Sequence, residues 1–168
     1  MKRLWAPWRL EYVTAAAGGD DPSCVFCRAL DPATPSEHLL YRGARVFVIL
    51  NKYPYNNGHL MVVPIRHVAR MADATPEELT ELIAVTRLAE MALTEAYGPH
   101  GINVGMNLGR TAGAGVVGHL HVHLVPRWEG DTNFMSVVSE TRVVPEAPAA
   151  SVARLRPVFE RLTAAPVS

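Results

Sequence analysis

The sequence predicts a single α+β domain with a five-stranded antiparallel sheet and two main helices. Three short apolar runs are each bounded by Gly, Pro or Asn, which is typical of strands, and two later segments are also predicted to be strands. One long segment has helical spacing after a clear helix-start signal, and a second lies near the C-terminus. A chain of 168 residues can bury a substantial core. We therefore expect residues 1–168 to form one domain, with 1–23 as an N-terminal arm and 149–168 as a C-terminal helix and tail.

The first three predicted strands cover residues 39–41, 46–50 and 60–63, and we expect them to form an antiparallel meander. The segment NKYPYNNG between the second and third is rich in turn-forming residues, so it is predicted to be a loop. A fourth strand is predicted over 102–108 and a fifth over 119–125, with the glycine-rich stretch GRTAGAGVVG between them.

The long helix has a clear beginning and end in the sequence. Thr75 suits the N-cap, Pro76 the first helical position, and Glu78 can complete a capping box. Residues at helical spacing, Ile83 among them, continue to Tyr97, and Gly98-Pro99 ends the element. The second helix is predicted over 149–162, although it contains a proline.

Composition argues against partners that need a surface of one charge. Sixteen Lys+Arg balance sixteen Asp+Glu, so no field of one sign favours nucleic acid or a membrane surface. The N-terminus lacks an apolar run long enough for a signal peptide, and no later segment is long enough to span a bilayer. We expect a cytoplasmic protein without nucleic-acid or membrane partners.

Three histidines occupy alternate positions in the stretch GHLHVHLVP. In a strand, His119, His121 and His123 project from one face, whereas the intervening Leu120, Val122 and Leu124 face the core. Such a face suits a zinc site, in which imidazole nitrogens coordinate the metal. It equally suits nucleophilic catalysis, in which one imidazole attacks an electrophile while its neighbours orient it.

Two other stretches carry chemistry. The segment GMNLGRTAGAG directly precedes the histidines, and its backbone N–H groups can form an anion cradle, with a flexible surface turn as the alternative. Cys24 and Cys27 have the C-x-x-C spacing of a metal or redox pair, with two ordinary thiols as the alternative.

The motif HLHVHLVP matches the His-φ-His-φ-His-φ-φ signature of the histidine triad superfamily of nucleotide hydrolases and transferases, and NKYPYNNGHLMVVP resembles its second characteristic segment. Residues 2–148 resemble the bacterial branch of diadenosine tetraphosphate phosphorylases, also called ATP adenylyltransferases. The resemblance implies a histidine triad fold, a homodimer whose sheets join, and phosphorolysis of diadenosine tetraphosphate to ATP and ADP through an adenylyl-histidine. Alternatives are hydrolysis of dinucleoside polyphosphates or phosphoramidates, a catalytic zinc site, and a nucleotide-binding regulator without turnover.

The resemblance also implies roles for single residues. His121 would be the nucleophile, with its other ring nitrogen held by a main-chain carbonyl of the same strand, and His123 would donate to a phosphoryl or bridging oxygen. Asn51 would contact the ribose, Leu50 would lie near the base, and Trp128 is a candidate contact to the polyphosphate, with a core aromatic as its alternative. The remaining residues implied to line the substrate site are His59, Asn107, Gly113, Ala114 and Gly115.

In the zinc-bearing branches of the superfamily, a C-x-x-C pair, a histidine after the VVP strand and the first triad histidine form a tetrahedral site. By position these residues are Cys24, Cys27, His67 and His119. Four protein ligands leave no coordination position for water, so the resemblance implies a structural zinc. Magnesium is expected only as a companion of the nucleotide substrate, and orthophosphate is the expected second substrate.

Overall fold

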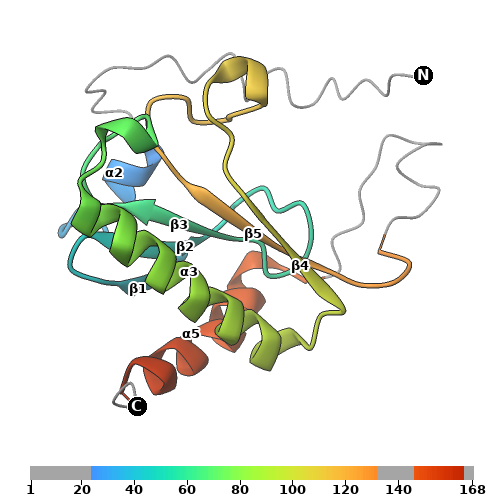
Figure 1. Cartoon of the computed structure of the whole chain (residues 1–168). Coiled ribbons are helices and arrows are strands. Elements are labelled where there is room, and N and C mark those ends of the chain that lie inside the picture. The colour runs from blue at the N-terminus through green and yellow to red at the C-terminus, as the bar shows by residue number, and fades with distance from the viewer. Residues whose placement is uncertain (1–23, 132–145, 165–168) are drawn as a thin grey trace, which may run out of the picture.

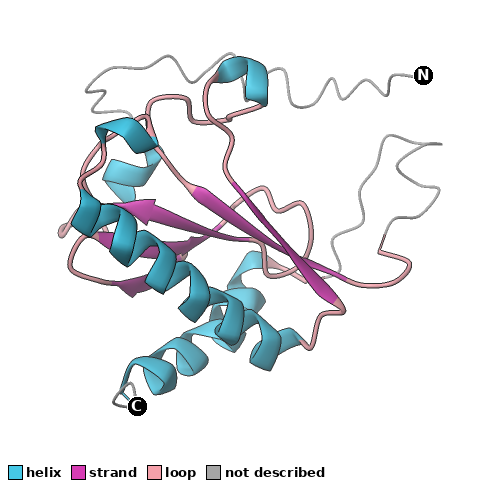
Figure 2. Cartoon of the chain, viewed as in Figure 1, coloured by secondary structure: helices cyan, strands magenta, loops and turns pink. Residues whose placement is uncertain are grey.

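The computed structural model describes residues 24–131 and 146–164, so the predicted N-terminal arm lies outside the described residues. Five antiparallel strands form one sheet in the order β1-β2-β3-β5-β4, with two long helices beside it (Figures 1 and 2). The strands are β1 (Leu39–Arg42), β2 (Val46–Leu50), β3 (Leu60–Pro64), β4 (Gly101–Gly105) and β5 (Val122–Arg127). The helices are α2 (Val25–Ala29), α3 (Pro76–Tyr97) and α5 (Pro148–Ala164), with short 3₁₀ turns η1 (Met71–Asp73) and η2 (Arg110–Ala112). The α+β class, the five antiparallel strands and the initial meander are confirmed.

The fifth strand begins three residues later than predicted. Its pairing with β3 ends at Val62 and Val122. Beyond that pair, the N–H of Leu120 donates to the carbonyl of Val68 at 2.6 Å, so the chain around it bonds to the loop after β3. His119 and His121 therefore precede the strand, yet Leu120 still packs into the helix-side core, and the predicted alternation of faces persists.

The sheet is buried on both faces at its centre. α3 and α5 cover one face, where the buried residues of the helices meet those of the strands (Figure 1). A smaller apolar cluster on the opposite face contains Phe47, Ile49, Met61 and Val63, with Phe26 of α2 packed against them. β2 and β3 are buried along their whole length, as their unbroken apolar sequences indicate. The histidines share this second face with α2.

α3 begins and ends where the sequence predicts. The Thr75 hydroxyl accepts from the N–H of Glu78, and the Glu78 carboxylate accepts from the N–H of Thr75 at 2.8 Å, which completes the capping box. Gly98 ends the helix in the left-handed conformation. Ile83, predicted within the apolar stripe, is 62% exposed, whereas Leu82 next to it is buried. α5 contains Pro157 without ending there. None of the described helices is long and apolar enough to cross a bilayer.

Candidate active site and metal centre

A main-chain carbonyl two residues earlier holds His121 in one tautomer. The side chain is 4% exposed, and its Nδ1 lies 2.8 Å from the carbonyl oxygen of His119. A carbonyl can only accept, so Nδ1 carries the proton and Nε2 carries a lone pair. Burial lowers the pKa of His121 below its ordinary value of 6.5. The residue therefore presents a neutral, nucleophilic nitrogen at neutral pH.

His123 is held in the opposite tautomer through a neighbouring histidine. The N–H of Tyr55 donates to Nδ1 of His59 at 3.0 Å, so His59 carries its proton on Nε2. His59 Nε2 lies 2.9 Å from Nδ1 of His123, which must accept, and His123 then carries its proton on Nε2. The rings of His121 and His123 have centroids 4.7 Å apart. A lone pair and an N–H donor therefore lie side by side.

The structure places several predicted substrate residues differently. Leu50 packs in the core under the helices, because alternation along β2 directs it away from the histidine face; its contact with a base stays a prediction. Trp128 packs on Tyr97 at the end of α3, with ring centroids 6.3 Å apart. It lies five residues beyond His123 along β5, about 16 Å at strand spacing. Trp128 is thus an aromatic beside α3 in this chain, and its contact with a polyphosphate stays a prediction.

Asn51 lies beside His59, and its side chain takes part in two hydrogen bonds. Its amide oxygen accepts from the N–H of Tyr53 at 3.0 Å, and its Nδ2 lies 3.3 Å from Nδ1 of His59. The side chain fixes the loop that follows β2 and supports the tautomer of His59. Contact with a ribose stays a prediction.

The glycine-rich loop folds on itself. Gly109 and Gly113 adopt left-handed φ values of 84° and 89°, which a side chain would strain. The N–H groups of Gly113 and Ala114 donate to carbonyls of the same loop, at 2.9 and 3.3 Å, so these two amides do not form the predicted open cradle. Asn107 donates to the carbonyl of Gly113 at 3.3 Å. An oxyanion role for Gly115 stays a prediction.

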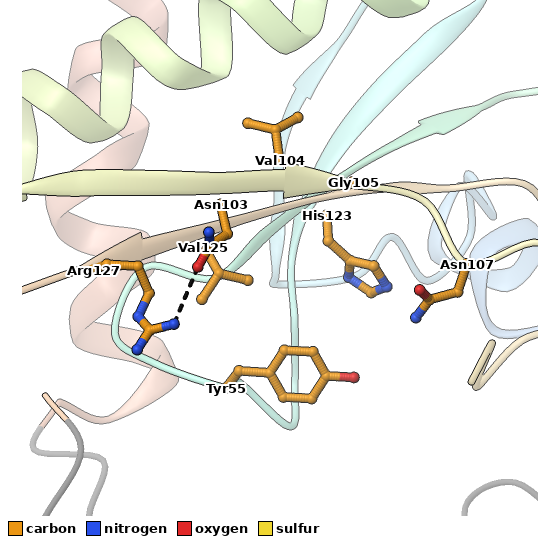
Figure 3. A pocket seen from close by; sticks show the side chains of 8 residues that line it. All are labelled: Tyr55, Asn103, Val104, Gly105, Asn107, His123, Val125 and Arg127. Carbon is orange, nitrogen blue, oxygen red and sulfur yellow. Dashed lines mark hydrogen bonds between the residues drawn. The ribbon is translucent and has the colours of Figure 1, made fainter. Parts of the chain in front are cut away.

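A cavity of about 380 Å³ adjoins the triad on the histidine face of β4 and β5 (Figure 3). Residues of both strands and of the loop over 51–58 line it, and His123 points toward it beside Asn107 (Figure 3). It is lined by Tyr55, Asn103, Val104, Gly105, Asn107, His123, Val125 and Arg127. The N–H donor of His123 therefore faces a space that can admit a ligand.

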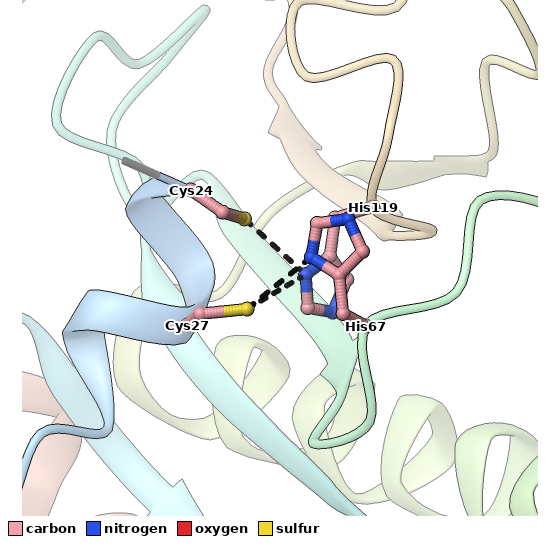
Figure 4. A group of neighbouring side chains, drawn as sticks. All are labelled: Cys24, Cys27, His67 and His119. Carbon is pink, nitrogen blue, oxygen red and sulfur yellow. Dashed lines mark hydrogen bonds between the residues drawn. The ribbon is translucent and has the colours of Figure 1, made fainter. Parts of the chain in front are cut away.

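Cys24, Cys27, His67 and His119 gather at the other side of the triad and could hold a metal ion (Figure 4). Their ligand atoms all lie within 4.8 Å of one another. Cys24 Sγ is 3.4 Å from His119 Nδ1, and Cys27 Sγ is 3.3 Å from His67 Nδ1 and 3.7 Å from His119 Nδ1. Tetrahedral zinc with ordinary bond lengths separates sulfur and nitrogen ligands by about 3.5 Å. The four residues therefore fit zinc.

The surroundings of His119 suit a metal ligand. Its Nε2 donates to the carbonyl of Pro64 at 2.8 Å, which directs the Nδ1 lone pair toward the thiols. Burial lowers the pKa of His119 to about 4, although the Pro64 carbonyl acts in the opposite direction, so the ring is neutral at pH 7. The short helix α2, absent from the prediction, places Cys24 and Cys27 one turn apart on one side.

Two residues of the site were missed from the sequence. Phe26, between the two cysteines, packs on both His119 and His121, with ring centroids 5.4 and 5.1 Å apart. Tyr55 supplies the amide that fixes His59, and its ring lies 4.7 Å from that of His59. Their places within CVFC and NKYPYNNG were the available signals.

A sheet that carries paired histidine tautomers beside a Cys2His2 cluster indicates the class of protein, and comparison of the chain with known proteins leads to the same class. The family model of the HIT domain matches residues 33–130, and the chain belongs to this family. A Mycobacterium tuberculosis protein named AP-4-A phosphorylase is 41% identical over 156 residues, which cover 87% of this chain and 78% of the relative. The asymmetrical bis(5'-nucleosyl)-tetraphosphatase of Schizosaccharomyces pombe is 34% identical over 93 residues, 55% of this chain and 50% of that protein.

A solved structure shares the fold over most of its length. It is a zinc-bound histidine triad family protein from Mycobacterium smegmatis, with a TM-score of 0.70 and 30% identity. The similarity covers 86% of this chain and 98% of that chain. The family expectation from the triad motif is confirmed.

Proposed function

We propose that this chain is a nucleotidyltransferase that cleaves diadenosine tetraphosphate by phosphorolysis to ATP and ADP. The relative named AP-4-A phosphorylase supports the substrate and the reaction. The observation that carries the chemistry is the pairing of tautomers: Nε2 of His121 bears a lone pair, and the adjacent His123 bears an N–H donor. Such a pair can attack a phosphorus atom and stabilise the departing oxygen.

In the first step, Nε2 of His121 attacks the α-phosphorus of the dinucleotide. The N–P bond forms as the bond between the phosphorus and the bridging oxygen breaks, and the electron pair leaves with ATP. The Nε2–H of His123 donates to that oxygen as its charge develops. The carbonyl of His119 accepts from Nδ1 of His121 and stabilises the positive charge that the attacking ring gains. The product is AMP bonded to His121.

In the second step, an oxygen of orthophosphate attacks the same phosphorus. The N–P bond breaks, its electron pair returns to Nε2 of His121, and ADP leaves. We expect Asn107, which lines the cavity beside His123, to contact phosphate oxygens through its amide. We assign magnesium to the polyphosphate and not to a protein ligand.

The test is mass measurement of the intermediate. The enzyme is mixed with diadenosine tetraphosphate without phosphate, quenched without acid, and digested, and the peptide covering residues 119–123 is weighed. We expect an added AMP on His121, no adduct in a His121→Gln variant, and an unchanged adduct in the surface control His100→Gln. Absence of the adduct from the wild type would contradict the proposal.

The second candidate keeps the adenylyl-histidine and uses water as the acceptor. The tetraphosphatase relative supports it. The two reactions differ in their products, because phosphorolysis yields ADP only when orthophosphate is present. AMP that appears at the same rate with and without phosphate favours the hydrolase.

We propose zinc as the metal of the Cys24, Cys27, His67 and His119 cluster. Two thiolates and two imidazoles at tetrahedral separations are the donors that zinc prefers, and the zinc-bound relative supports the assignment. Four protein ligands would leave no position for water, so the ion would brace the fold beside the triad. Zinc supplies no catalytic step in this proposal.

We also propose a homodimer that extends the sheet across β4. This strand is at one edge of the sheet, and its residues Asn103, Val104 and Gly105 are exposed. An exposed edge can pair with the same strand of a second copy. Light scattering tests this, and we expect twice the chain mass of 18.3 kDa.

A further inference from the structure

The cavity in Figure 3 continues beyond the triad as a trough along β4 and β5. Asn103 and Gly105 of β4 lie opposite Val125 and His123 of β5, and Tyr55 stands across the trough. A methyl group built on Gly105 would meet no atom within 4 Å. The proposed chemistry uses only the end at His123, so most of the trough is open to another part of a ligand.

The direction of the reaction indicates which part of the substrate enters. Displacement at phosphorus places the leaving oxygen opposite the attacking nitrogen, with nucleophile and leaving group roughly in line. His121 supplies the nitrogen and His123 the donor to the leaving oxygen. His123, Val125 and Arg127 project from the same face of β5, and this row spans about 13 Å at strand spacing. The leaving group must therefore extend from His123 along this row.

We infer that the trough binds the leaving nucleotide, with its phosphates near His123 and its nucleoside toward Arg127. The inference rests on the proposed function and adds the subsite that distinguishes a dinucleoside polyphosphate from a mononucleotide. A volume of about 380 Å³ falls within the range of small-molecule sites.

The charges along the trough support this order. His123 and Asn107 provide N–H donors at the triad end, which suits phosphate oxygens. At the far end, Arg127 is paired with Asp131 through two hydrogen bonds and donates to Asn103 at 3.1 Å. Because Asp131 offsets its charge, that end suits the neutral polar edges of a ribose or base better than a phosphate.

Tyr55 provides a flat wall for a base. Its ring lies 4.7 Å from that of His59 and 6.0 Å from that of His123, so it belongs to a group of neighbouring rings. Aromatic rings bind bases by stacking with little dependence on which base is bound. The wall lies across from Val125, within the part of the trough assigned to the nucleoside.

Two reactions of the same enzyme separate the trough from the triad. Phosphorolysis of diadenosine tetraphosphate has ATP as its leaving group and needs the whole trough. Exchange of labelled orthophosphate into ADP runs the second step backward and then forward again. In the backward direction His121 attacks ADP, and the leaving group is phosphate, which needs only the triad end of the trough. The variant Asn103→Phe places a large ring in the trough from an exposed strand.

We expect Asn103→Phe to lower kcat/KM for diadenosine tetraphosphate at least tenfold, chiefly through KM, and to weaken inhibition of phosphate–ADP exchange by ATP. The exchange rate itself should change less than twofold. The control Ile83→Phe adds a ring on the exposed side of α3 and should change neither reaction. Light scattering and thermal unfolding verify assembly and folding, and Asn103→Leu replaces a variant that does not fold.

Equal loss of both reactions, or no loss of either, would overturn the inference. In another outcome, the wild type forms the adenylyl-histidine and exchanges phosphate into ADP while Asn103→Phe cleaves the dinucleotide at the normal rate. That result would refute the subsite and leave the proposed function intact. A wild type that exchanges no phosphate contradicts the proposed function instead.

Discussion

Removing one ligand of the Cys2His2 cluster should abolish the dependence of stability on zinc. The ligands come from segments far apart in the chain, since Cys27 and His67 are 40 residues apart and Cys24 and His119 are 95 apart. The unfolded chain does not hold them together, so zinc binds mainly the folded state. Each tenfold rise in free zinc above the dissociation constant then adds about 1.4 kcal/mol to the free energy of unfolding. For a chain of this size, that raises the unfolding temperature by roughly 3–6 °C.

The assay is thermal unfolding followed by circular dichroism in a series of buffered zinc concentrations. We expect this slope for the wild type and for His100→Ala, an exposed histidine outside the cluster. His67→Ala keeps three ligands and should show no slope over the same concentrations. The same slope in His67→Ala, or a wild type whose unfolding temperature ignores chelation, would refute the metal assignment.

Removal of the metal should also lower the rate of the catalysed reaction. The His119 ring is a proposed ligand and its carbonyl accepts from His121, so a displaced ring moves the group that orients the proposed nucleophile. Misplacement of a reacting group by about 1 Å can cost roughly 100-fold in rate. We expect chelation to lower kcat at a temperature where the fold persists, with little change in KM, and zinc to restore it. Unchanged kcat would show that the cluster braces the fold alone.

Three further predictions concern stability. Glu78 accepts from Arg66, which lowers the pKa of the Glu78 carboxyl. The contribution of this pair to stability is therefore present at neutral pH and is lost as pH falls through the lowered pKa. The difference in unfolding free energy between wild type and Glu78→Gln should shrink below about pH 4. Gly58→Ala should destabilise by about 1–3 kcal/mol in urea unfolding, because φ is 71° and the methyl would lie 2.8 Å from the Tyr97 ring. Phe26→Ala should cost about 3–5 kcal/mol in the same assay, and a loss below 1 kcal/mol would contradict its packing on two histidines.

Most of the fold could be predicted because its signals are local. Thr75 and Glu78 are three residues apart and cap their helix without help from the rest of the chain. The short helix α2 lacks such a signal: no side chain caps its start at Cys24, and packing of Phe26 and the four-residue cluster accompany its formation. The start of β5 also depends on a distant group, the carbonyl of Val68. Elements stabilised by remote contacts are therefore the ones that sequence patterns misplace.

The same distinction between local signals and remote contacts applies to the candidate site. The alternation of His119, His121 and His123 is a property of four successive peptide bonds, so their common side could be predicted. The orientation of Leu50 could not be predicted, because it depends on which face of a strand buried on both sides meets the helices. The role of Tyr55 is carried by its backbone amide, which leaves no trace in the identity of a side chain.

Three chemically identical rings differ here because the main chain gives each a different partner. His119 donates from Nε2 to the carbonyl of Pro64, which leaves Nδ1 for a metal. His121 donates from Nδ1 to the carbonyl of His119, which leaves Nε2 without a proton, as the proposed attack on phosphorus requires. His123 accepts at Nδ1 from His59, itself fixed by a backbone amide, which leaves an N–H for an oxygen. The same His-x-His-x-His pattern on a strand with other backbone partners would set other tautomers, so the motif alone does not determine which ring attacks.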